Sequence, residues 1–65
     1  MNTDTGTMSP AEYRDLRVAI GMTQLQLAIA LGVTPGTISK RERGEAPIDE
    51  EAVRALRHLS EQTDR

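Results

Sequence analysis

Residues 23–43 decide the fold, and they read TQLQLAIALGVTPGTISKRER. The stretch predicts one helix over 24–31, rich in Gln, Leu and Ala, and a second from 35 to about 43 that begins after a Thr-Pro pair. Gly32 ends the first helix, and only Val33 then precedes the cap of the second. So short a connection forces the two helices to turn sharply against each other, which is the geometry of a helix-turn-helix.

Helical signals continue on both sides of this stretch. Ser9-Pro10-Ala11-Glu12 is a capping box with proline at the first helical position, and it predicts a helix over about 10–20. A fourth helix is expected over about 49–61, because acidic residues suit its start and apolar residues recur behind them. The sequence therefore predicts an all-α, compact four-helix domain over residues 9–62, after a flexible leader over residues 1–8.

The composition excludes several classes of function. The chain has 65 residues, no Cys, one His and a single aromatic residue, Tyr13. Disulfides, thiolate zinc sites and His-rich metal sites are thereby excluded, and no nucleophile, base and cofactor site can be assembled. We expect no enzyme, no cofactor and no metal. The sequence has no signal peptide and no apolar stretch long enough for a membrane, so we expect a cytoplasmic protein.

The helical periodicity separates a core side from an exposed side. The predicted core consists of the apolar residues that share helix faces: Tyr13, Leu16, Ile20, Leu27, Ala28, Leu31, Val33, Ile38, Val53 and Leu56. The opposite side of the helix over 35–43 carries small, polar and cationic residues: Gly36, Thr37, Ser39, Lys40 and Arg43. Core packing accounts for the first set and leaves the second set free to meet a partner.

The spaced motifs of this chain resemble the Cro/lambda-repressor-like helix-turn-helix family. The residues that carry the resemblance, within about 10–59, are Gly21-Met22-Thr23-Gln24, Leu27-Ala28, Leu31-Gly32-Val33-Thr34, Thr37-Ile38-Ser39-Lys40 and Glu42-Arg43-Gly44. The resemblance implies a sequence-specific DNA-binding transcriptional regulator, expected to be a repressor of the phage, plasmid or defence-system type that often acts on its own promoter. It further implies a homodimer on a palindromic operator, with the helix over 35–43 in the major groove.

The resemblance also assigns roles to individual residues. Phosphate contacts fall to Gln24, Thr34, Thr37 and Arg43, and the base-facing positions are Pro35, Gly36, Ser39 and Lys40. Lys40 is the expected base reader, with guanine O6 and N7 as its targets. Pro35 and Gly36 stand where the family often has long polar side chains. Fewer side-chain contacts to base edges are therefore expected at the start of this helix.

A net charge of −2 argues at first sight against a nucleic-acid partner. Residues 14–43, however, carry five basic and two acidic side chains, whereas residues 44–65 carry three basic and six acidic ones. Charges farther away than a Debye length of about 8–10 Å are screened, so the cationic half decides whether phosphates are attracted. We expect weak non-specific binding, with affinity resting on specific contacts and on two paired subunits.

Several residues allow two interpretations. Arg41 stands where the family commonly has an apolar residue. Either the aliphatic part of its side chain covers the core, or its guanidinium group contacts a phosphate. The resemblance implies a structural pair between Arg17 and Glu42. His58 is expected to be a surface or half-buried residue. Leu25 and Ile29 are expected to enlarge a small core. The alternative is that they form a surface patch for another protein, as in a protein-binding helix-turn-helix module such as an antitoxin or anti-regulator.

Overall fold

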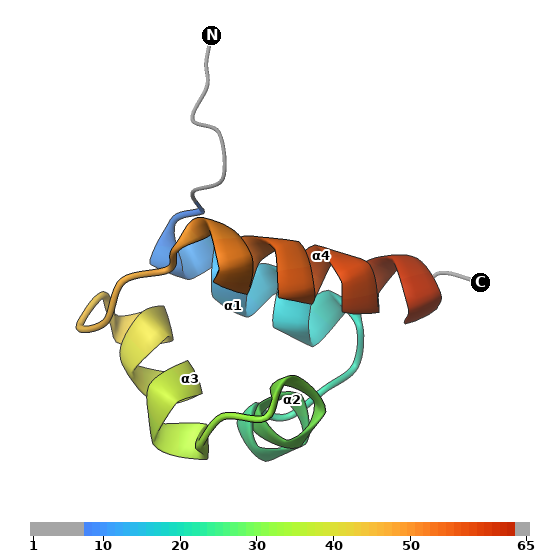
Figure 1. Ribbon diagram of the computed structural model, residues 1–65, viewed down its shortest axis with the longest axis horizontal. Coiled ribbons are helices and arrows are strands. Elements are labelled where there is room, and N and C mark those ends of the chain that lie inside the picture. Colours follow the sequence, from blue (N-terminus) through green and yellow to red (C-terminus); the bar gives the residue numbers. More distant parts are fainter. Residues whose placement is uncertain (1–7, 64–65) are drawn as a thin grey trace, which may run out of the picture.

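Four helices make up the computed structural model, which describes residues 8–63. They are α1 (Pro10–Ala19), α2 (Gln24–Leu31), α3 (Pro35–Arg43) and α4 (Glu50–Thr63), as Figure 1 shows. No strand occurs over this range, and the predicted all-α, four-helix fold is confirmed. Residues 1–7 of the predicted leader lie outside the described residues.

Side chains at the helix starts explain why the helices begin where they do. Ser9 Oγ accepts from the Glu12 amide at 3.0 Å, and Glu12 Oε1 accepts from the Ser9 amide at 2.9 Å, so the predicted capping box is present. Thr23 and Gln26 form a second box at the start of α2. Helix α4 begins one residue later than predicted, because Asp49 Oδ1 accepts from the Ala52 amide at 2.9 Å and so caps the helix from outside.

The turn between α2 and α3 depends on Gly32. Its φ of 73° lies in the left-handed region, which glycine enters without the steric cost of a β-carbon. The Val33 amide donates to the Ala28 carbonyl at 3.0 Å and the Gly32 amide to the Ile29 carbonyl at 3.3 Å. These bonds satisfy the last carbonyls of α2 and turn the chain back, so that α2 and α3 pack against each other.

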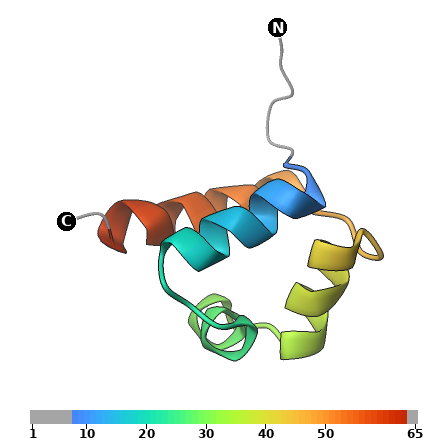
Figure 2. The same cartoon turned by 180° about the vertical axis from the view of Figure 1, so that it is seen from behind.

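The core lies where all four helices meet. Helices α1 and α4 lie side by side, and α2 and α3 lie across from them (Figures 1 and 2). Each helix contributes a fully buried side chain: Tyr13, Leu27, Ile38 and Leu56. Met8, assigned to the leader by the sequence, is instead half-buried against this core. None of the helices in residues 8–63 has the length and apolar character needed to cross a bilayer.

The prediction that Leu25 and Ile29 enlarge the core is wrong. Their side chains are 56% and 72% exposed. The physical reason is their place on α2, because each is two positions from the buried Leu27 and successive helical residues turn by about 100°. Leu25 and Ile29 therefore lie nearly opposite Leu27, and no other helix of residues 8–63 covers that side.

Candidate nucleic-acid interface

The outer face of α3 is small, polar and cationic. Ile38 anchors the helix in the core and is fully buried. All six sequence-predicted contact residues on this helix are exposed or half-buried: Pro35, Gly36, Lys40 and Arg43 are exposed, and Thr37 and Ser39 are half-buried. Among residues 8–63, and apart from the adjoining backbone, an added β-carbon at Gly36 would meet Thr34 Oγ1 at 3.8 Å. Another backbone can therefore approach α3 closely at this point.

The start of α3 combines two threonine hydroxyls with the positive end of a helix dipole. Thr34 Oγ1 accepts from the Thr37 amide at 3.2 Å and lies 3.0 Å from Thr37 Oγ1. The N-terminal end of a helix carries a partial positive charge, which suits a phosphate oxygen. Thr34 and Thr37, both sequence-predicted phosphate contacts, thus lie together at an end of α3 suited to an anion.

A buried carboxylate connects α1, α2 and α3. Arg17 Nε donates to Glu42 Oε2 at 2.6 Å, and Arg17 Nη2 donates to Oε1 at 3.3 Å. The two side chains are only 13% and 6% exposed, which confirms the predicted structural pair. Gln24 Nε2 donates to the same Oε1 at 3.0 Å, so this sequence-predicted phosphate contact bonds to protein in the free domain. The first residue of α2 is thereby fixed relative to α3.

The charge state of Glu42 follows from its surroundings. Burial alone would raise the pKa of this carboxyl group. Hydrogen bonds from Arg17 and Gln24, and the positive charges of Arg17 and Arg14, outweigh the burial and hold the pKa below its ordinary value of 4.5. Glu42 is therefore ionised at neutral pH and makes a charged, not a neutral, junction between the helices.

Arg41 belongs to the core side of α3. Its Nη1 donates to the Tyr13 hydroxyl at 2.9 Å, and its guanidinium carbon lies 5.7 Å from the centre of the Tyr13 ring. The ring face attracts the cation, and the bond satisfies the polar end of a fully buried tyrosine. Of the two interpretations of Arg41, the structure shows the one in which the side chain covers the core.

Arg43 is engaged by a residue that the sequence reasoning overlooked. Its Nε and Nη2 donate to the two carboxylate oxygens of Glu45 at 3.2 and 3.0 Å, and its Nη1 donates to Ser39 Oγ. The sequence carries no local signal for this contact, because it depends on the left-handed Gly44, which turns the chain back toward the last turn of α3. The exposed cations of α3 are therefore Lys40, which forms no ion pair among residues 8–63, and Arg43, which does.

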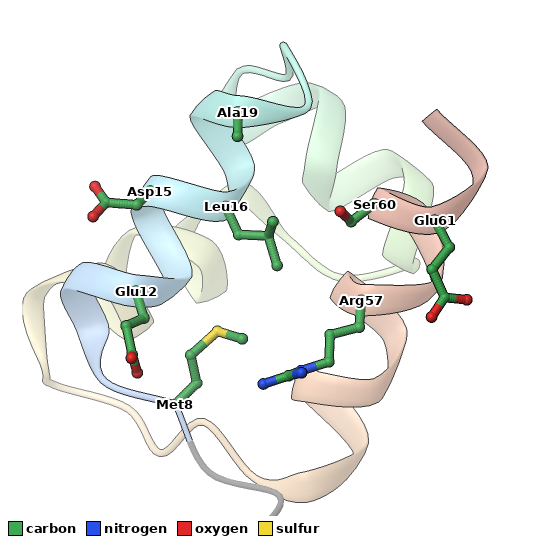
Figure 3. A pocket seen from close by; sticks show the side chains of 8 residues that line it. All are labelled: Met8, Glu12, Asp15, Leu16, Ala19, Arg57, Ser60 and Glu61. Atoms are coloured by element: carbon green, nitrogen blue, oxygen red, sulfur yellow. The ribbon is translucent and has the colours of Figure 1, made fainter. Parts of the chain in front are cut away.

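A concave surface lies between α1 and α4, away from the outer face of α3. It is an open groove of about 600 Å³ with a partly apolar floor, and none of its lining residues belongs to α3. Figure 3 shows the side chains that line it: Met8, Glu12, Asp15, Leu16, Ala19, Arg57, Ser60 and Glu61. No group of His, Cys, Asp or Glu side chains in the described part of the chain is placed to hold a metal ion. His58 is exposed, as predicted.

Comparison with known families agrees with the geometry of α2 and α3. A family model described as "Helix-turn-helix" (HTH_3, the Cro/C1 type) matches residues 14–59, which include most of α1 and the whole of α2 and α3. No curated protein matches the chain. The matched family is one of DNA-binding regulatory domains, not typically of enzymes. The resemblance drawn from the spaced motifs is confirmed, and the chain belongs to the Cro/C1-type helix-turn-helix family.

Proposed function

We propose that this protein is a sequence-specific transcriptional repressor of the phage, plasmid or defence-system type, which acts in the cytoplasm and places α3 in the major groove of its operator. The observation that carries the proposal is the outer face of α3, where Gly36 and Lys40 are exposed and Ser39 is half-buried while Ile38 anchors the helix. A major groove admits one helix, and short polar or cationic side chains on its outer face reach base edges. Thr34, Thr37 and Arg43 flank that face and hold phosphates.

A homodimer on a palindromic operator completes the proposal. One α3 of 9 residues reads too few base pairs to select a site, whereas two copies read half-sites about 34–36 Å apart. Dimerisation also compensates for the net negative charge of the chain, because the phosphate contacts of a single domain contribute little to DNA affinity. Autoregulation fits this form, since the protein's own concentration then sets how fully the operator is occupied.

Substitutions of Lys40 and Arg43 should separate base reading from phosphate binding. Lys40→Ala is expected to lose about 1–3 kcal/mol of discrimination at one base position. Arg43→Ala is expected to weaken binding to all sequences alike and to reduce the slope of log K against log salt by up to about 0.9. Selection of binding sites from a random pool, followed by titrations at several stated salt concentrations, measures both quantities.

The matched control for these variants is Arg54→Ala. Arg54 is an exposed cation of α4 that bonds Glu50 at 2.9 Å, so the change removes one charge without altering α3. It should leave the discrimination unchanged. If Lys40→Ala and Arg43→Ala both bind the selected site as the parent does, α3 is not the reading helix.

One observation favours a second function, the binding of another protein. Leu25 and Ile29 are exposed neighbours on α2, outside the face that α3 presents. An antitoxin or anti-regulator would use such a pair, and it could bind DNA as well.

The double variant Leu25→Glu/Ile29→Lys tests that surface. It should change the free energy of unfolding by no more than about 0.5 kcal/mol, because both side chains are already in water. Thermal and urea unfolding measure this, with Leu27→Ala, the buried leucine of α2, as the destabilising control. A protein partner that binds the parent and not the double variant supports the second function, and an equally strong complex with both excludes this surface.

A further inference from the structure

The end of α3 places the carboxylate of Glu45 against Arg43, a proposed phosphate contact. Gly44, at φ 78°, ends the helix, and the Glu45 amide donates to the Lys40 carbonyl at 2.8 Å. The Gly44 amide donates to the Arg41 carbonyl at 3.2 Å, which completes a Schellman turn. The backbone of Glu45 is thereby held beside the last turn of α3, and its side chain lies over Arg43.

All three nitrogen atoms of the Arg43 guanidinium are occupied in the free domain. Glu45 takes Nε and Nη2 in the two-point geometry that guanidinium also uses for phosphate. Ser39 Oγ takes Nη1. Three of the five N–H groups of Arg43 are thereby engaged, so a DNA phosphate can take the Nε–Nη2 edge only by displacing Glu45. A carboxylate in the same two-point arrangement is a direct competitor for that phosphate.

The charge on the face of α3 is reduced by the same contact. Two exposed cations lie on this face, Lys40 and Arg43, and Glu45 cancels one of them. Lys40 is close enough to Glu45 to help lower the pKa of its carboxyl group, after the hydrogen bond and charge of Arg43, so Glu45 is ionised at neutral pH. Arg43 and Glu45 are each more than half exposed, and exposed pairs contribute little to stability. Any substantial effect of Glu45 should therefore be on binding.

We propose that Glu45 competes with DNA phosphates for Arg43 and thereby lowers the affinity of α3 for duplexes of every sequence. The inference rests on the proposed function, because it requires a duplex against α3. Glu45 acts through Arg43 and reads no base, so operator and non-operator duplexes are affected by a similar factor.

The test is Glu45→Gln, measured with a short fluorescein-labelled duplex of mixed sequence by fluorescence anisotropy. At low salt we expect binding about 3- to 10-fold tighter than that of the parent, with the gain shrinking as salt screens the charge. The slope of log K against log salt should become steeper by less than about 0.9, the value for one whole phosphate, because Arg43 already neutralises part of a phosphate in the parent. Glu61→Gln is the matched control, because it removes the same charge at the end of α4 that lies far from α3 in Figures 1 and 2.

The Arg43→Ala background decides whether Glu45 acts through Arg43. In that background Glu45→Gln should tighten binding no more than Glu61→Gln does, because the contested cation is absent. A gain that persists without Arg43, or a gain in the parent no larger than the Glu61→Gln control, would overturn the inference. A parent that binds no duplex at all overturns the proposed function itself, which is a distinct result. Circular dichroism confirms that each variant is folded.

Discussion

Replacement of Glu42 by alanine is expected to lower the free energy of unfolding by about 3–5 kcal/mol, because it leaves the guanidinium of Arg17 buried without a counter-ion. The Arg17 side chain is 13% exposed, and Glu42 accepts two of its hydrogen bonds. The same change removes the acceptor of Gln24 Nε2. Domains of this size have little stability to lose, so urea unfolding should find the variant largely unfolded near room temperature.

Two controls separate the buried charge from charge in general. Glu50→Ala removes a carboxylate that bonds Arg54 in the open, with 69% of its side chain exposed, and should cost less than about 1 kcal/mol. The pKa of Glu42 is lowered in the fold, so its stabilising contribution is present above pH 4.5, the ordinary value, and is lost as the pH falls through the lower folded value. Glu42→Gln should lack this part of the acid sensitivity. A Glu42→Ala variant as stable as the parent would mean that Arg17 finds another partner.

Replacement of Tyr13 by alanine is the second change with a large expected cost, about 3–5 kcal/mol. Tyr13 is the single aromatic residue of the chain and is fully buried. Its removal leaves a cavity among Leu27, Ile38 and Leu56, the other fully buried side chains, and withdraws the ring that Arg41 covers. Thermal unfolding followed by circular dichroism should show a steep drop in the midpoint.

Tyr13→Phe distinguishes the ring from its hydroxyl. The phenylalanine keeps the packing and loses only the bond from Arg41 Nη1, so we expect a loss of about 0.5–1.5 kcal/mol. An equal loss in both variants would show that the hydroxyl bond, and not the ring volume, stabilises the core. Arg41→Met complements the pair, since it retains an apolar stem over the ring without a charge.

The helices could be predicted from sequence because their signals are local. The Ser9 capping box, the glycine after α2 and the Thr34-Pro35 start of α3 each act within a few residues, and the observed ends agree to within two residues. The Arg17–Glu42 pair joins distant positions, and it was accessible only because the family resemblance supplied it. The match over residues 14–59 confirms the family from which it came.

The predictions that failed concern which side chains are covered or contacted by other parts of the fold. The assignment of residues to helices was correct apart from the helix ends. Leu25 and Ile29 have the right chemistry for a core, but burial depends on another element to cover them, and the sequence carries no local sign of one. Glu45 was counted only as one charge of an acidic half, because its contact with Arg43 depends on the direction in which the chain leaves Gly44. The roles of Gln24 and the α3 residues toward DNA stay predictions.

The shared carboxylate of Glu42 has a consequence for how the domain meets a ligand. Glu42 receives two bonds from Arg17 and one from Gln24, so loss of the third leaves neither oxygen without a donor. The Gln24 amide can therefore exchange its protein acceptor for one on an incoming molecule while α1 and α3 stay joined. The Arg17–Glu42 pair keeps α1 and α3 joined without Gln24, so the side-chain amide of Gln24 can change its acceptor without loosening the fold.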